Sequence, residues 1–234
     1  MNNKNVVVDN RADTADDSER TREPVASNAS LSYTWWSAYA VLGAMILTIP
    51  LGIGFFVYEG VFALLSDLGG LLVGLVLAPL VWGLYHLHAG DPLNRPVFGV
   101  GVVTIAGICL GSFGLVVMYL LSLDPETFGT TFLGIQFFGW ILLGFWLLGI
   151  GVLGRRTGAV QPRTAWTAIV AGIGTVGGMV TLIYSYAVGS FTLLFPLLML
   201  VFAVGFLLWA FWLGGELRAK ARRDSTSSQR GDSV

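Results

Sequence analysis

Long apolar runs, separated by short polar or turn-forming segments, dominate the chain from Trp35 onward. A helix that crosses a bilayer needs about 20 mainly apolar residues, because the hydrocarbon core is about 30 Å thick. By this criterion the pattern predicts spans at about 36–57, 68–87, 97–121, 131–153, 165–188 and 191–213. The last two share one uncharged stretch, which we divide at Gly189-Ser190 because that pair suits a tight turn. The expected fold is all-α: a polytopic transmembrane bundle of six helices.

The composition excludes a soluble globular protein. Of the 234 residues, 55% are hydrophobic and only 12% are charged, and the mean hydropathy is +0.74. Residues 1–34 are polar and lack the apolar content to pack a core, so we expect a disordered cytoplasmic tail. Residues 35–215 form the expected transmembrane domain, and residues 216–234 a basic, then polar and disordered, second tail. A cleavable signal peptide is not expected, because the first apolar run starts too late and is too long.

The basic residues predict the topology. With six spans, all 13 Lys and Arg residues fall on one side of the membrane. They are Lys4, Arg11, Arg20, Arg22, Arg95, Arg155, Arg156, Arg163, Arg218, Lys220, Arg222, Arg223 and Arg230. Short segments rich in Lys and Arg stay in the cytoplasm. We therefore expect a multi-pass protein of the cell membrane with both termini in the cytoplasm.

Asp67 has two interpretations. If the second helix starts at Leu68, Ser66-Asp67 precedes it as a cap, and residues 60–65 lie at the outer interface. If the helix starts at Val61, Asp67 lies about 10 Å along it, inside the membrane, where an ionisable group marks a functional site by default. We favour the cap, because a buried charge is costly and no basic residue lies on that side.

The outer half carries further polar groups that together suggest a cation site. The candidate solute or cation residues are Asp67, Gln136, Glu59, Asp124 and Glu126. An acidic entrance would concentrate cations. The alternative, which we favour, is that these acids are scattered residues left after Lys and Arg were excluded from the outer side.

Other chemistries find little support in the sequence. His86 and His88 stand two apart, so they point to different faces of a helix and do not form a metal site. Cys109 is the only cysteine, and no phosphate-binding loop, dinucleotide fingerprint or metalloprotease motif is present. We therefore expect no enzyme, no metal, no cofactor and no nucleic-acid partner.

Small residues indicate how the helices pack against each other, and basic residues indicate where the protein contacts lipid headgroups. Glycines four apart, as at Gly107 and Gly111 or Gly174 and Gly178, let helices approach closely. They predict a tight bundle and also suit a homo-oligomer. The candidate contacts for anionic lipids on the cytoplasmic face are Arg155, Arg156, Arg163, Arg218, Lys220, Arg222 and Arg223.

Two helix ends, "FWLLGIGVLGRRTG" and "FLLWAFWLGGELRAK", resemble uncharacterised six-helix membrane proteins of bacteria and archaea over roughly residues 36–220. Such proteins have no agreed activity to transfer, and the excess of Arg over Lys fits a prokaryotic source. Two functions follow from the residues. The favoured one is a non-enzymatic helical scaffold or interaction protein. The alternative is a small transporter for a cation or cationic solute that uses the outer acids.

Overall fold

The described residues form a helical membrane bundle. The computed structural model describes residues 28–58, 61–190 and 192–231. In these ranges the helices are α1 (Asn28–Tyr58), α2 (Val61–Leu87), α3 (Asn94–Leu121), the short π-helix η1 (Pro125–Gly129), α4 (Thr130–Thr157), α5 (Pro162–Val188) and α6 (Leu194–Gly231). All six α-helices are long and apolar enough to cross a membrane. The all-α, six-helix prediction is therefore confirmed, and the fold is that of a multi-pass membrane protein.

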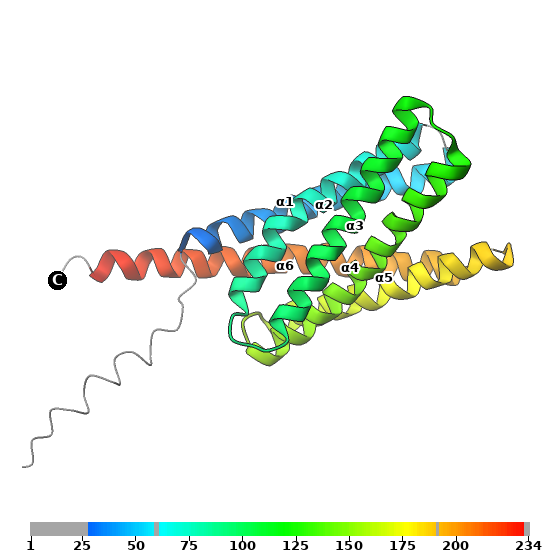
Figure 1. Ribbon diagram of the computed structural model, residues 1–234. Helices are drawn as coiled ribbons and strands as arrows, with labels where there is room; N and C mark the ends of the chain where they lie inside the picture. The colour runs from blue at the N-terminus through cyan, green and yellow to red at the C-terminus, as the bar shows by residue number, and fades with distance from the viewer. Residues whose placement is uncertain (1–27, 59–60, 191, 232–234) are drawn as a thin grey trace, which may run out of the picture.

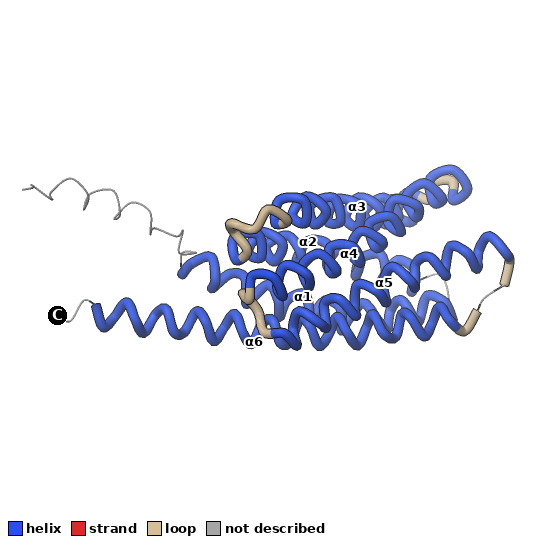
Figure 2. Tube along the Cα trace, turned by 90° about the horizontal axis from the view of Figure 1, so that it is seen from below, coloured by secondary structure: helices blue, strands red, loops and turns tan. Residues whose placement is uncertain are grey.

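The α-helices form a closed ring in chain order. Each packs against the next, and α1 also packs against α6 (Figures 1 and 2). The start of α1 and the end of α6 lie at the same end of the bundle, which we call the termini end (Figure 1). The α2–α3 and α4–α5 connections lie there too, and the α3–α4 connection lies at the opposite end (Figure 1). α6 extends beyond the bundle at the termini end.

Aromatic side chains fill the centre of the ring. Trp146 on α4 and Trp209 on α6 are fully buried, and their rings meet edge to face at 5.8 Å between centroids. Phe206 on α6 packs against Trp209 at 5.4 Å. Edge-to-face aromatic pairs add to the stabilisation that comes from burial. α4 and α6 are therefore joined by side chains across the middle of the bundle.

Glycines set the close approach of neighbouring helices. α4 has a glycine every five residues from Gly134 to Gly154, and each step turns about 140° around the helix. Successive positions therefore meet different neighbours: a Cβ at Gly139 would lie 2.6 Å from the Ile108 nitrogen of α3. A Cβ at Gly144 would lie 2.6 Å from a Val176 methyl of α5. From Gly139 onward the repeat places small residues against α3 and α5 in turn.

Gly158 and Gly189 end two of the helices. Gly158 follows α4 with φ +65°, and Gly189 follows α5 with φ +70°. This left-handed conformation suits glycine, which has no Cβ to clash, and it turns the chain out of the helix. The long uncharged stretch is thus divided at Gly189.

The start of α2 differs from the sequence expectation of a span at 68–87. α2 begins at Val61, so residues 61–65 belong to it and not to an interfacial segment. Ser66 and Asp67 resemble a cap in sequence, but helical hydrogen bonding through residues 61–67 satisfies backbone groups that the bilayer could not. The expectation that Asp67 caps the second helix is therefore wrong.

The tails also differ from expectation at their membrane-proximal ends. α1 begins at Asn28, inside the predicted polar tail of residues 1–34, whose first 27 residues lie outside the described ones. α6 continues to Gly231, so most of residues 216–234 is helical. The segment after Leu217 is rich in Ala, Lys and Arg, which favour helix, and no proline interrupts it.

Candidate functional site

Three helices bring Asp67, Ser112 and Gln136 together; we call these residues the Asp67 cluster. They come from α2, α3 and α4, and all three side chains are buried, with relative exposures of 9%, 0% and 8%. Asp67 stands six residues after the start of α2, about 9 Å along the helix axis. The cluster therefore lies inside the bundle, toward the end opposite the termini.

The Gln136 amide connects the cluster. Its Nε2 donates one hydrogen bond to Asp67 Oδ1 at 2.9 Å and another to Ser112 Oγ at 2.8 Å. An amide nitrogen has two hydrogens, so both are used. One side chain thus links α2, α3 and α4.

Glycines beside the cluster make this approach possible. A Cβ at Gly111 would lie 2.5 Å from the backbone nitrogen of Gln136. A Cβ at Gly70 would lie 2.6 Å from Ser112 Oγ. Real Cβ atoms do not come this close to backbone, so any larger residue at Gly111 would push α3 and α4 apart. The small-residue positions of α2 and α3 hold the polar groups within hydrogen-bond distance.

The charge of Asp67 has no basic neighbour. Every Lys and Arg among the described residues belongs to the termini end. Among those residues, the Asp67 carboxylate accepts a hydrogen bond only from Gln136. An uncompensated carboxylate in a low-dielectric interior is costly. A proton or a small cation on Asp67 would remove that cost.

The cluster does not resemble a transition-metal or calcium site. In the described ranges, no group of three or more His, Cys, Asp or Glu side chains is placed to hold a metal ion. Gln136 turns its nitrogen, not its oxygen, toward both partners. This donor arrangement suits a carboxylate or a carboxylic acid, and a bound cation would require the amide to rotate.

The other predicted acids are not part of this cluster. Asp124 and Glu126 are exposed in the α3–α4 connection, and Glu59 lies outside the described residues. Asp124 caps η1: its carboxylate accepts hydrogen bonds from the Thr127 hydroxyl at 2.6 Å and from the Glu126 N–H at 3.2 Å. These hydrogen bonds lower the pKa of Asp124. Of the four candidates that the structure describes, only Asp67 and Gln136 are brought together.

The seven basic candidates at the termini end have different surroundings. Arg156 pairs with Asp91 at 3.4 Å. Arg163 lies over the ring of Trp212, and Arg218 over that of Trp35, each at 5.4 Å from the centroid. Three others, Arg155, Lys220 and Arg223, line one cavity, and Arg222 is exposed on α6.

His88 is a buried structural residue. Its Nδ1 lies 2.9 Å from Thr157 Oγ1, and that hydroxyl donates to the Leu153 carbonyl. The hydroxyl oxygen therefore accepts from Nδ1–H, and Nε2 carries the lone pair. In the described part of the chain, no atom hydrogen-bonds to Nε2. Burial, followed by the charge of Lys220, lowers the pKa of His88 to about 4.

Two residues of these sites are not among the sequence candidates. Ser112 is a polar residue in an apolar span, next to Gly111, and that neighbourhood is the signal that could have found it. Glu216 is an acid of α6 just before the basic segment that starts at Arg218, and its carboxylate accepts from the Gln161 N–H at 2.9 Å and the Thr164 hydroxyl at 2.5 Å. Glu216 thus accepts hydrogen bonds from donor groups at the start of α5. This role depends on the packing of α6 against α5, which the sequence does not show.

Comparison of the chain with known protein families, curated proteins and solved structures found no match. The class of the protein therefore comes from the chain itself: six helices suited to cross a membrane around a buried polar cluster. The resemblance to uncharacterised six-helix membrane proteins of bacteria and archaea stays a prediction.

Proposed function

We propose that the protein is a small membrane transporter that moves a proton, or exchanges a proton for a small cation, and that Asp67 is the group that binds it. The observation that carries this proposal is the burial of Asp67 within α2 without a basic partner among the described residues. Ionisable groups inside a membrane bundle are rare and commonly belong to ion pathways or proton relays.

The surroundings of Asp67 support proton binding in particular. Gln136 can donate to the carboxylate and can keep donating to its carbonyl oxygen after protonation. The Gln136 hydrogen bond is therefore kept in both protonation states. Binding a metal cation would instead need the Gln136 oxygen, which is turned away from both partners.

The packed centre of the ring supports a carrier and not an open channel. Trp146, Trp209 and Phe206 fill the space that a pore would need. A carrier alternates access by moving helices against each other. Backbones meet directly at Gly107 and Gly139 in the α3–α4 contact and at Gly144 and Gly172 in the α4–α5 contact, and such small-residue contacts allow helices to shift against each other.

The test is proton flux in liposomes that contain the purified full chain and a trapped pH-sensitive dye. A pH gradient, alone or against a gradient of Na⁺ or K⁺, is imposed, and internal pH is followed. We expect the wild-type protein to couple at least one gradient to proton movement, and Asp67→Asn to abolish it while folding normally. Asp124→Asn removes an exposed acid at the same end and should keep the flux.

A second candidate is a helical scaffold, in which the Asp67 cluster only locks three helices. It is favoured by the full use of both Gln136 amide hydrogens within the protein. A wild-type protein without flux for any tested cation, together with a lower melting temperature for Asp67→Asn, would select the scaffold. Flux that survives in Asp67→Asn would exclude Asp67 as the transport residue.

A further inference from the structure

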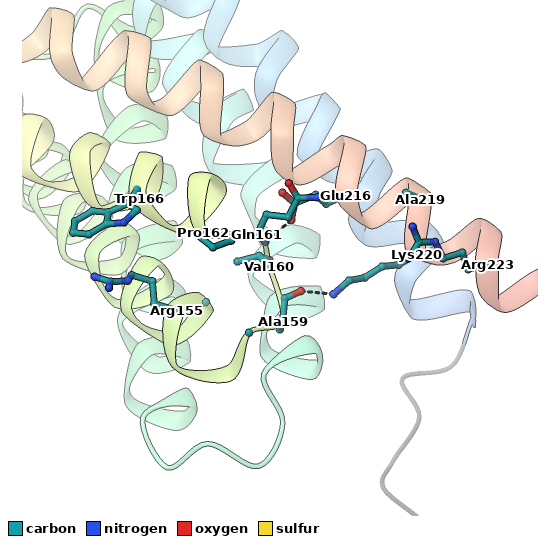
Figure 3. A pocket seen from close by; sticks show the side chains of 12 residues that line it. Arg155, Ala159, Val160, Gln161, Pro162, Trp166, Glu216, Ala219, Lys220 and Arg223 are labelled. Atoms are coloured by element: carbon teal, nitrogen blue, oxygen red, sulfur yellow. Dashed lines mark hydrogen bonds between the residues drawn. The ribbon is translucent and has the colours of Figure 1, made fainter.

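A cavity of about 580 Å³ lies at the termini end, where α4 ends, α5 begins and α6 passes (Figure 3). Its size falls within the range of about 300–1,000 Å³ typical of small-molecule sites. Arg155 and Trp166 line one side, and Lys220 and Arg223 of α6 line the other, with the α4–α5 connection between them (Figure 3). Two helices, α4 and α6, thus contribute cationic side chains to one lining.

The cationic groups of the cavity keep free donors. Arg155 Cζ lies over the Trp166 ring, 4.4 Å from its centroid, and this cation–π contact uses the ring face and not a hydrogen-bond acceptor, so the guanidinium keeps its N–H donors. Lys220 donates to the Ala159 carbonyl, which uses one of the three ammonium hydrogens. Arg223 is exposed at the rim.

The acid of the cavity does not cancel this charge. Glu216 is buried, and its oxygens accept from the Gln161 N–H and the Thr164 hydroxyl at the first turn of α5. The partial positive charge of a helix start balances a carboxylate placed there. With Arg155, Lys220 and Arg223 against Glu216, the lining has an excess of two positive charges.

Apolar groups complete the lining. Val160, Pro162 and Ala219 face the same cavity as the bases. Trp166 is half exposed beside it, as expected for an aromatic residue at the membrane–water interface. A ligand that fills this space needs an anionic part and an apolar part.

We propose that this cavity binds the headgroup and glycerol region of an anionic phospholipid in the leaflet at the termini end. The bases bind the phosphate, and the apolar lining and Trp166 contact the glycerol and the upper acyl chains. A basic cavity between helices at the interface has the chemistry for such headgroups. This site is at the opposite end from Asp67, so it does not depend on the proposed transport function.

The experiment compares lipid binding by native mass spectrometry of the full chain in detergent. The probes are dioleoyl phosphatidylglycerol and dioleoyl phosphatidylcholine, which differ in headgroup charge. The test variant is Lys220→Gln with Arg223→Gln, from the cavity. The matched control is Arg163→Gln with Arg218→Gln, which removes the same charge from bases that lie over Trp212 and Trp35.

We expect the wild-type protein to prefer phosphatidylglycerol, and the cavity pair to weaken that binding about 10-fold or more, since each base contributes measurably to anionic lipid binding. The control pair should leave it nearly unchanged. Arg155→Gln changes the other side of the cavity and should weaken binding as well, which provides a second variant on another helix.

Three outcomes would overturn the proposal. Equal weakening by the cavity and control pairs would mean diffuse attraction to a basic surface. Equal binding of phosphatidylcholine would remove the charge recognition. Displacement of phosphatidylglycerol by millimolar inorganic phosphate would assign the cavity to a free anion. Melting temperatures of all variants, measured in the same detergent, identify any variant that has lost its fold.

Discussion

Gly111 and Gly134 show how differently two helix glycines behave. Gly111 faces the backbone of Gln136 across the α3–α4 contact, and a Cβ there would lie 2.5 Å from the Gln136 nitrogen. Gly134 lies on the exposed side of α4, and an added Cβ would meet nothing within 4 Å. The first glycine is required by packing beside the Asp67 cluster, and the second is not.

Replacing Gly111 by Ala should therefore destabilise the protein by about 1–3 kcal/mol, the usual cost of forcing an extra carbon into a packed contact. Replacing Gly134 by Ala should leave stability unchanged or raise it slightly, because alanine restricts the unfolded chain. The measurement is the midpoint of thermal unfolding in detergent micelles. Equal effects of the two substitutions would show that α3 and α4 are not held together at Gly111.

The α2–α3 connection is docked on the end of α4. Asp91 accepts from the Leu93 N–H at 2.8 Å and pairs with Arg156 of α4. Asn94 donates to the Tyr85 carbonyl at 2.7 Å, which ties the start of α3 to the end of α2. His88 contacts Thr157 beneath this turn. Three helix ends are thus joined by polar contacts at the termini end.

Acidification should weaken this junction through His88. Its pKa is lowered from 6.5 to about 4, so the folded state holds the ring neutral while the unfolded chain takes up a proton. The stability that depends on the neutral ring is present above pH 6.5 and is lost as the pH falls from about 6.5 toward about 4.

His88→Gln removes this titration and keeps a side chain that can hydrogen-bond to Thr157. We expect its melting temperature to fall less between pH 7.5 and pH 4.5 than that of the wild-type protein, whatever its absolute stability. A parallel decline of both proteins would mean that His88 does not contribute to the pH dependence.

The bundle is asymmetric along its axis. Arg95, Arg155, Arg156 and the bases of α6 belong to the termini end, while the exposed acids Asp124 and Glu126 belong to the opposite end. Short basic segments are retained in the cytoplasm during insertion. We therefore predict that the termini end faces the cytoplasm.

Cysteine labelling tests this orientation and the burial of Asp67 together. In a Cys109→Ala background, single cysteines replace Asp124, Ala89 or Asp67, and a membrane-impermeant thiol reagent is added to intact cells. We expect Asp124→Cys to react quickly and Ala89→Cys only after permeabilisation, since both positions are exposed but at opposite ends. Asp67→Cys should be protected in either case.

Fast labelling of Ala89→Cys in intact cells would reverse the orientation. Fast labelling of Asp67→Cys would contradict its burial and remove the basis for the transport proposal. Insertion of each variant is checked by its melting temperature after purification.

Some of this architecture follows directly from the amino-acid pattern. The apolar runs predict the helices because each backbone N–H and C=O in a bilayer must be paired within the segment, which leaves helix as the local solution. The start of α2 was not predictable in the same way. The Ser66-Asp67 pair followed by glycines has the local chemistry of a helix start, and only the membrane setting favours continuing the helix back to Val61.

The Asp67 cluster could not be derived from any local pattern. Asp67 and Gln136 are 69 positions apart, and Ser112 is 24 positions from Gln136. Whether they meet depends on the height and rotation of α2, α3 and α4 relative to one another. The height and rotation of these helices are set by close contacts at Gly70 and Gly111. The spacing of small residues in the sequence indicates that such contacts exist, but it does not show which helix makes them.

The chain therefore dictates how many apolar helices form and where its charges gather, because both depend on the composition of each segment and its transfer into lipid. Only the packed bundle decides that Asp67 is buried against Gln136, and that Arg155, Lys220 and Arg223 face one cavity. These outcomes depend on side-chain contacts between distant helices, and such contacts form only when the helices assemble.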